Sequence, residues 1–257
     1  MSEPRIAMIL YTVREPAQDD LVGTLKQVRD AGFEYVQWSG MPKLPADEAR
    51  AALDAAGLTA FAAHCAVEPF EDNFESEVAF WQTLGANDVA PGGMMQDCKD
   101  DLAAWLCGAK RLDEVGRRLR DAGMRLSYHN HDREFERFPD DDRCKLDILY
   151  EETDPANLYA ELDVCWVQAG GADPAEYIRK YANRCPLIHA KDMKAERNER
   201  GGPVFVPLGQ GVLDWQAILS AARESGVDWF IYEQDSCEGD LFEEVRASYA
   251  FLAEHLG

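Results

Sequence analysis

The segment Asp121–Asp132 reads DAGMRLSYHNHD, and it contains the pattern that decides the fold. A polar stretch typical of a helix ends in a small residue and Gly123, and the hydrophobic run Met124–Asn130 follows at once. Glycine just past a helix supplies a left-handed C-terminal cap, and a short turn then leads into a strand. The segment therefore predicts a helix, a tight turn and a buried strand, in that order.

The same helix–glycine–strand pattern recurs along the chain. Its other glycines are Gly32, Gly57, Gly85 and Gly226. Repeated copies of this pattern indicate that helices and strands alternate, so the strands are parallel and the helices connect them.

Eight hydrophobic runs are expected to form one sheet. They are Arg5–Tyr11, Phe33–Trp38, Leu58–His64, Asn87–Ala90, Met124–Asn130, Leu158–Val164, Leu187–Ala190 and Trp229–Glu233. Eight units in 257 residues give about 32 residues each, the size of the units in a (β/α)8 barrel. The alternative is a doubly wound sheet, but no GxGxxG motif follows the first run. We therefore predict an α/β protein, a single-domain TIM barrel over residues 1–257.

Composition and charge restrict the class of partner. The chain has 48 acidic and 26 basic residues, a formal net charge of −22. Such a charge repels phosphate backbones and anionic lipids, so no nucleic acid or membrane partner is expected. No apolar run approaches the ~18 residues of a membrane span, and Met1–Arg5 lacks the pattern of a signal peptide. The seven cysteines form no CxxC pair, which disfavours disulfides and thiolate zinc sites. These features predict a cytoplasmic enzyme.

Metal-capable side chains gather where the predicted strands end. These residues are His64, His129, His131, Asp163, His189, Lys191, Asp192, Glu233 and Asp235. In a barrel the carboxyl ends of all strands meet at one mouth. Imidazole and carboxylate groups together suit Mn²⁺, Fe²⁺, Co²⁺, Zn²⁺ or Mg²⁺. Because Asp163, His189 and Glu233 end three successive strands, the sequence predicts a metal site there.

These motifs resemble those of the sugar phosphate isomerase/epimerase superfamily, the xylose-isomerase-like TIM barrels. The segments that carry the resemblance cover nearly the whole chain: Leu10–Arg14, Ala31–Gln37, Tyr128–Phe135, Glu161–Trp166, His189–Asp192, Gly209–Trp215 and Glu233–Asp235. The resemblance implies one divalent metal ion, with Mn²⁺ as the first choice, held by Glu, Asp, His and Glu from four strand ends. It places Asp163, His189 and Glu233 in the last three of these positions.

The first glutamate of that set is where this chain departs from the family pattern. The matching position holds His129, within the string Tyr-His-Asn-His. The fourth ligand is therefore His129, His131 or Glu134, and we favour His129. The departure puts in doubt the scheme of the related ketose epimerases, in which two metal-bound carboxylates act as acid and base. The string looks closer to the dehydratase and keto-sugar branch.

Such a site suits removal of a proton next to a sugar carbonyl, because a divalent cation stabilises the enediolate that forms. The candidate bases are His131, Lys191 and Glu233, the last as both ligand and base. Strand alternation points Lys191 to the same side as His189. The structural alternative for Lys191 is an ion pair with Asp192 or Glu161.

The leading prediction is a metal-dependent sugar isomerase or epimerase. The alternatives are a dehydratase or lyase acting on an inosose-like or 3-keto-glycoside substrate, and a non-catalytic sugar-binding barrel. Residues at or just past strand ends are expected to bind the sugar: Tyr11, Arg14, Trp38 and His64. Core packing is an equal alternative for Trp38. The chain has no glycine-rich phosphate loop, which favours a neutral sugar, and homo-oligomers are common among the resembled proteins.

Overall fold

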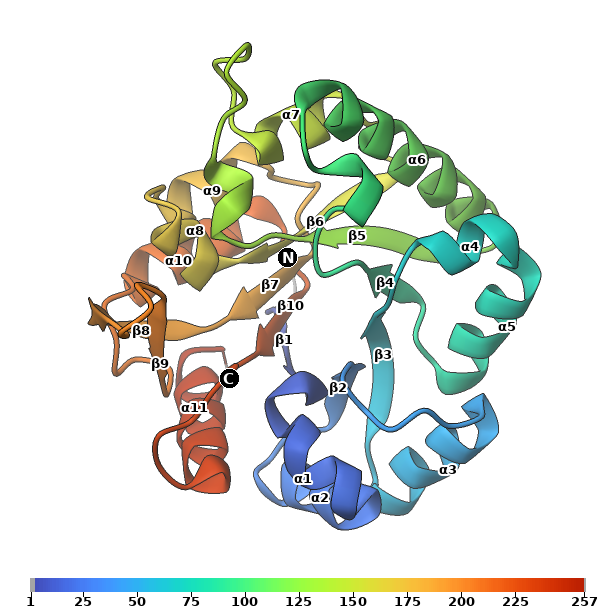
Figure 1. Cartoon of the computed structure of the whole chain (residues 1–257). Helices are drawn as coiled ribbons and strands as arrows, with labels where there is room; N and C mark the ends of the chain where they lie inside the picture. Colours follow the sequence, from blue (N-terminus) through green and yellow to red (C-terminus); the bar gives the residue numbers. More distant parts are fainter. Residues whose placement is uncertain (1–2, 257) are drawn as a thin grey trace.

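Eight parallel strands close into a barrel that is surrounded by helices (Figure 1). The structure is a computed structural model that describes residues 3–256, so residues 1–2 and 257 of the predicted domain lie outside the described part. In spatial order the barrel strands are β1 (Arg5–Ile9), β10 (Trp229–Tyr232), β7 (Leu187–Ala190), β6 (Leu158–Asp163), β5 (Arg125–His129), β4 (Asp88–Ala90), β3 (Thr59–His64) and β2 (Tyr35–Trp38). The predicted TIM barrel is confirmed.

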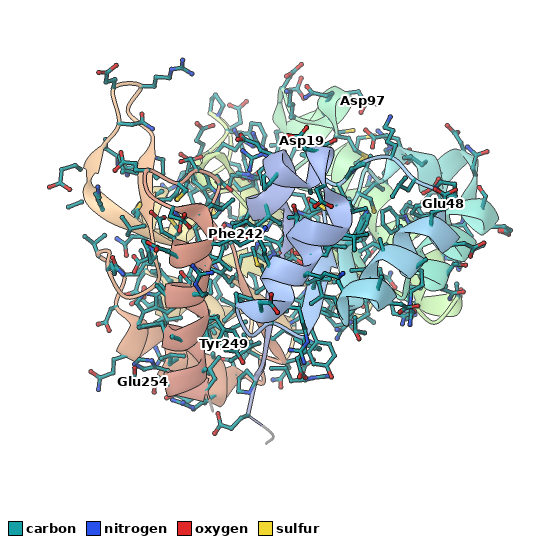
Figure 2. All side chains as sticks on the ribbon, turned by 90° about the horizontal axis from the view of Figure 1, so that it is seen from below. Asp19, Glu48, Asp97, Phe242, Tyr249 and Glu254 are labelled. Carbon is teal, nitrogen blue, oxygen red and sulfur yellow. The ribbon has the colours of Figure 1, made fainter. Side chains whose placement is uncertain are left out.

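Helices occupy the outside of the barrel, as the alternating pattern predicts. They are α1 (Arg14–Asp19), α2 (Leu21–Asp30), α3 (Ala46–Ala56), α4 (Glu68–Asp72), α5 (Phe74–Leu84), α6 (Leu102–Asp121), α7 (Lys145–Glu151), α8 (Val164–Ala169), α9 (Pro174–Lys180), α10 (Trp215–Ser225) and α11 (Leu241–Leu256). Across residues 3–256, no helix combines the length and the apolar character needed to cross a membrane. Acidic side chains such as Asp19, Glu48 and Glu254 lie on the outer surface (Figure 2), where the net charge is solvated.

The interior of the barrel changes character along its axis. Toward the amino ends of the strands it is filled by apolar side chains, where the rings of Phe61 and Trp229 stack with centroids 4.0 Å apart. Toward the carboxyl ends the inward side chains become polar. In the register of the neighbouring strands, His129 pairs with Glu161 and Asp163 pairs with His189. The apolar layer thus forms a floor beneath a buried polar layer.

One part of the fold was not predicted. None of the eight predicted runs covers the segment Met193–Leu213, which contains most of an antiparallel hairpin of β8 (Asp192–Arg197) and β9 (Pro203–Val206). The hairpin projects from the barrel rim beside β7 (Figure 1). In β8 only Met193 is a buried apolar side chain, and the strand continues with the charged residues Lys194, Glu196 and Arg197, so its pattern is mostly that of an exposed loop.

Asp192 organises the turn after this hairpin. Its carboxylate accepts hydrogen bonds from the backbone N–H groups of Gly209 at 3.0 Å and Gly211 at 3.1 Å, and from the indole N–H of Trp215 at 2.8 Å. A Cβ atom on Gly211 would lie 2.0 Å from the Asp192 carboxylate and 2.4 Å from the Met193 carbonyl oxygen. Gly211 is therefore needed for the close approach of this turn to Asp192.

Candidate metal centre and its pocket

The four side chains favoured as metal ligands lie together at the mouth of the barrel. They are His129 at the end of β5, Asp163 at the end of β6, His189 on β7 and Glu233 just after β10. All four are buried, and one ligand atom of each lies within 4.8 Å of the others. His189 Nδ1 is 2.7 Å from Glu233 Oε2, and His129 Nε2 is 3.9 Å from Asp163 Oδ2.

The other two candidates for the fourth ligand are placed differently. Glu134 is buried and already engaged, since its carboxylate accepts hydrogen bonds from the Tyr128 hydroxyl at 3.1 Å and the His131 backbone N–H at 2.7 Å. The His131 side chain faces the mouth, with its ring centroid 5.1 Å from that of His129. Of the three candidates for the fourth ligand, only His129 lies in one group with Asp163, His189 and Glu233.

Lys191 is fully buried among carboxylates. Its Nζ lies 3.0 Å from Asp163 Oδ2, 3.0 Å from Glu233 Oε2 and 3.1 Å from Asp235 Oδ1. The expected alternative, an ion pair with Asp192 or Glu161, is wrong, because the partners come from the ends of β6 and β10. Burial alone would lower the pKa of Lys191, but these carboxylates outweigh it and hold the pKa well above its usual value. Lys191 is therefore an ammonium ion.

Two aromatic rings enclose that ammonium group. The Trp166 ring centroid lies 5.4 Å from Lys191 Nζ, and the Phe205 ring centroid lies 5.3 Å away. Trp166 belongs to α8 and Phe205 to the unpredicted hairpin. Both distances permit a cation–π attraction. The hairpin thus helps to shield the charged cluster from solvent.

Glu161 is a buried residue of the site that was not predicted from the sequence. It is fully buried one layer below the mouth and contacts the imidazoles of His64, His129 and His189. Gln37 on β2 donates a hydrogen bond to its second oxygen at 2.8 Å. A signal was present, because Glu161 and Asp163 are two residues apart on one strand and so point to the same side.

The histidines of the cluster differ in charge. Burial lowers the pKa of His129 well below its usual value and lowers that of His131 to about 3, so both rings are neutral. Burial would also lower the pKa of His189, but the carboxylates of Glu161 and Glu233 outweigh it and raise the pKa to about 10. Glu161 itself stays ionised: burial raises its pKa, but the charge of His189 and the neighbouring His64 imidazole lower it further.

A cavity of about 380 Å³ opens above the four grouped side chains. It is lined by Tyr11, Ser39, His64, Gly92, His129, His131, Glu233 and Asp235. Of the predicted sugar-binding residues, Tyr11 and His64 therefore line the mouth. Arg14 does not line this cavity; its guanidinium lies over the Tyr11 ring at 4.1 Å and donates to the Asp235 carbonyl at 3.0 Å.

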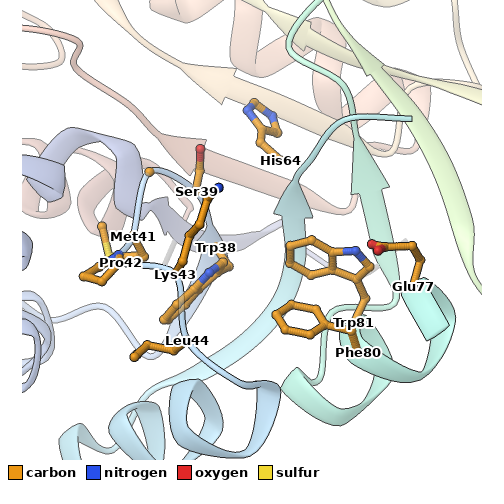
Figure 3. A pocket seen from close by; sticks show the side chains of 11 residues that line it. Trp38, Ser39, Met41, Pro42, Lys43, Leu44, His64, Glu77, Phe80 and Trp81 are labelled. Carbon is orange, nitrogen blue, oxygen red and sulfur yellow. The ribbon is translucent and has the colours of Figure 1, made fainter. Parts of the chain in front are cut away.

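A second cavity of about 450 Å³ adjoins the mouth, and we call it the apolar annex (Figure 3). Its lining is Trp38, Ser39, Gly40, Met41, Pro42, Lys43, Leu44, His64, Glu77, Phe80 and Trp81. Ser39 and His64 line both cavities, so the two are adjacent at these residues. Trp38, the fourth predicted sugar-binding residue, belongs to the annex.

The comparison with known protein families agrees with this geometry. The sequence model of the family described as xylose isomerase-like TIM barrel matches residues 25–255. The chain belongs to this family.

The curated relatives of this xylose isomerase-like barrel include inosose dehydratases. The enzyme of Clostridium beijerinckii is 28% identical over 169 residues, which are 60% of this chain and 55% of the relative. That of Lacticaseibacillus casei is 29% identical over 164 residues, 58% of this chain and 53% of the relative. The chain thus spans about half the length of the curated relatives it matches.

Solved structures resemble the barrel over its whole length. A sugar phosphate isomerase/epimerase from Parabacteroides distasonis superimposes with a TM-score of 0.83 and 19% identity, covering 98% of this chain and 99% of that one. An L-ribulose 3-epimerase superimposes with a TM-score of 0.72 and 20% identity, covering 100% and 95%. At these identities the likeness shows the fold.

The residues of this xylose isomerase-like barrel fit a divalent cation. Two imidazoles and two carboxylates form a mixed N/O donor set of the kind that such ions take. Asp163 Oδ2 is buried, and apart from its ion pair with Lys191 at 3.0 Å it has no hydrogen-bond partner. The buried carboxylates of Glu161, Asp163 and Glu233 outnumber the cations of His189 and Lys191. An added positive charge would therefore offset a net negative charge in a site that water does not solvate.

We expect cation binding at this centre to strengthen as pH rises. His189 is an imidazolium below its pKa of about 10, so binding must displace its proton. One displaced proton raises the apparent affinity for Mn²⁺ about tenfold per pH unit between roughly pH 6.5 and 8.5. Calorimetric titrations in buffers of different ionisation enthalpy should show about one proton released per ion. A constant affinity with no proton release would contradict the imidazolium state of His189.

Proposed function

We propose that this chain is a divalent-metal-dependent sugar isomerase or epimerase that removes a proton next to a sugar carbonyl. The observation that carries the proposal is the meeting of His129, Asp163, His189 and Glu233 beneath the open mouth of the barrel. A cation held by these four residues would act as a Lewis acid on a carbonyl and its neighbouring hydroxyl. The proposed substrate is a small neutral carbohydrate with a keto group.

The side chains around the mouth supply complementary proton chemistry. Glu233 is ionised, because the charges of Lys191 and His189 lower its pKa well below the usual value despite burial. It can accept the proton from the carbon next to the carbonyl. His131 is neutral and also lines the mouth, so it is the candidate base for the other face of the sugar. Lys191 holds a fixed positive charge close to the oxygens that become negative.

A dehydratase or lyase reaction is the second candidate, and specific observations favour it. The site is asymmetric, because a neutral imidazole, His129, stands where a second carboxylate would give a matched acid–base pair. The curated relatives reported above are inosose dehydratases. After proton removal, loss of a hydroxyl or alkoxy group from the next carbon requires an acid. Asp235 lines the mouth, and burial raises its pKa to about 6, so it can donate that proton, with the Lys191 ammonium group 3.1 Å away.

The apolar annex favours a glycoside among the substrates of this second candidate. The mouth and the annex each fall within the ~300–1,000 Å³ of ordinary ligand sites. A substrate that fills both carries a polar ring at the charged cluster and an apolar group against Trp38, Phe80 and Trp81 (Figure 3). A 3-keto-glycoside with an aromatic aglycone has this form.

Incubation in D₂O tests the proposal and separates its two forms. The Mn²⁺-loaded protein is incubated with ketoses, inososes and 3-keto-glycosides, and the products are followed by NMR and ultraviolet absorbance. Deuterium entering an intact sugar indicates isomerisation or epimerisation. A new enone absorbance, with loss of water or aglycone, indicates elimination. Binding of these compounds with neither change would contradict both and support the sugar-binding barrel.

Phe80→Ala should weaken the use of aryl glycosides. Phe80 is half-buried in the annex, and loss of one aromatic contact costs ~1–2 kcal/mol of binding. We expect KM for an aryl 3-keto-glucoside to rise about tenfold, with little change for the methyl analogue. Phe242→Ala is the matched control, because Phe242 is also half-buried but lies on α11 outside the annex. Equal effects of Phe80→Ala on both substrates would contradict the assigned role of the annex.

A further inference from the structure

One oxygen atom of Glu161 is the meeting point of three imidazole rings. His64 Nε2 contacts Oε1 closely, His189 Nε2 lies 3.0 Å from it and His129 Nδ1 lies 3.3 Å from it. The other oxygen, Oε2, accepts the hydrogen bond from Gln37. Glu161 is completely buried, so these side chains replace its hydration. The remaining nitrogens of His129 and His189 face the upper carboxylates of Asp163 and Glu233.

Gln37 determines which nitrogen of His189 carries a proton toward the barrel interior. The Gln37 amide gives its N–H to Glu161 at 2.8 Å, so its carbonyl oxygen is the atom 2.8 Å from His189 Nε2. Both neighbours of Nε2, that carbonyl and the Glu161 carboxylate, are acceptors. Nε2 must therefore be protonated. The lone pair that His189 can offer a cation is then on Nδ1, the atom that faces Glu233.

The same reasoning applies to His129 with the opposite nitrogen. An imidazole that binds a cation through one ring nitrogen keeps its proton on the other. Nδ1 lies 3.3 Å from the Glu161 carboxylate, a contact at ion-pair distance that is not aligned as a hydrogen bond, whereas Nε2 lies 3.9 Å from its nearest carboxylate, Asp163. The closer acceptor favours a proton on Nδ1. The lone pair on Nε2 is then directed to the side where Asp163 lies.

We propose that Glu161 is the positioning residue of the metal centre, orienting both histidine ligands through one carboxylate oxygen. It fixes opposite tautomers in His129 and His189, so that two different nitrogens present lone pairs to the space between Asp163 and Glu233. Partners of this kind commonly orient metal-binding histidines and set their tautomers. The inference rests on the proposed metal-dependent function.

An alternative use of the same residues is an ion bound in the lower layer. His64, His129, Glu161 and His189 also bring ligand atoms within 4.8 Å of one another. In that arrangement Glu161 would be a ligand. The group nearer the mouth, which consists of His129, Asp163, His189 and Glu233, is favoured as the metal site for two reasons. It keeps a buried carboxylate oxygen, Asp163 Oδ2, whose only close partner is Lys191, and it offers a divalent cation two carboxylates where the lower group offers one.

The test compares Mn²⁺ binding to the full-length wild-type protein, Glu161→Gln and Glu161→Asp by isothermal titration calorimetry. Glu161→Gln keeps the length of the side chain and loses its negative charge, whereas Glu161→Asp keeps the charge on a side chain that is one methylene group shorter. Both are expected to weaken binding on the order of 10- to 100-fold, with one site retained. Asp88→Asn is the matched control, because Asp88 is a buried carboxylate of β4 that is paired with Arg125. It should bind Mn²⁺ as the wild type does.

Imidazole ¹⁵N NMR of the Zn²⁺-loaded protein gives a second readout, the tautomer of each histidine ring, which general destabilisation of the fold would not change. We expect a proton on Nδ1 of His129 and on Nε2 of His189 in the wild type, and a mixture of tautomers in Glu161→Gln. Wild-type affinity in Glu161→Asp would show that charge alone matters and would overturn the positioning role, as would an ion bound directly to Glu161. A wild-type protein that binds no divalent ion would overturn the proposed function as well. If the wild type binds Mn²⁺ and both Glu161 variants bind it with the same affinity, the positioning role of Glu161 would be overturned but the proposed function would not.

Discussion

Asp163→Asn is expected to remove metal binding and catalytic turnover together while the barrel stays folded. Asp163 caps α8, where its Oδ1 accepts the Trp166 backbone N–H at 3.0 Å. Asparagine caps helices about as well as aspartate, so the cap persists. The lost group is the anionic oxygen Oδ2, which faces the cluster without a hydrogen bond. The loss of Mn²⁺ affinity should exceed the roughly 10- to 100-fold that removal of a supporting partner costs.

The measurement combines metal content, turnover and circular dichroism. Asp173→Asn is the matched control, because Asp173 caps the neighbouring helix α9 in the same way but is exposed. It should retain both metal and activity. Glu233→Gln should behave like Asp163→Asn, since it removes the charge that faces His189 and Lys191. Normal turnover with full metal content in either site variant would show that the assigned ligand set is wrong.

Lys191→Met should destabilise the protein strongly. The substitution leaves the carboxylates of Asp163, Glu233 and Asp235 without their shared ammonium ion in a buried site. Removal of one partner from a buried ion pair costs roughly 3–5 kcal/mol. For a chain of this size that corresponds to a fall in Tm on the order of 10 °C, and turnover should also be lost. Differential scanning calorimetry of the metal-free protein measures the effect.

Lys194→Met provides the comparison for Lys191. Lys194 lies on β8 and pairs with Glu238 at 3.1 Å, but it is exposed. Exposed pairs contribute ~0–1 kcal/mol, so its Tm should barely change. Equal Tm values for Lys191→Met and the wild type would mean that the buried carboxylates do not depend on the ammonium ion, and the electrostatic account of the mouth would fail.

The sequence predicted the barrel because local signals and the overall fold agree. Each glycine cap is followed by a hydrophobic run, and all eight runs contain strands of the barrel. The predicted and observed strand ends differ where another local structure forms. The run Arg5–Tyr11 ends as a strand at Ile9, because Leu10–Val13 forms a 3₁₀ helix. The hairpin was missed because the charged residues of β8 give no strand pattern.

The candidate site was predicted from the places where strands end, and its supporting layer was not. His129, Asp163, His189 and Glu233 were expected to converge, and the structure places them together. Glu161 was considered only as an ion-pair partner of Lys191, because a carboxylate inside a strand also suits solvent exposure. For Lys191 the sequence suggested Asp192 or Glu161 as the ion-pair partner. The observed partners, Asp163, Glu233 and Asp235, come together only because the barrel closes.

The most direct test of the account is the location of a bound ion by anomalous diffraction from crystals of the Mn²⁺-loaded protein. The account predicts one peak at the barrel mouth, with His129 Nε2, Asp163, His189 Nδ1 and Glu233 at coordination distances of about 2.0–2.3 Å. Lys191 and Glu161 should border that shell without entering it. A peak bound instead by His64 and Glu161, or no peak at the mouth, would contradict the assignment of these four residues as the metal ligands.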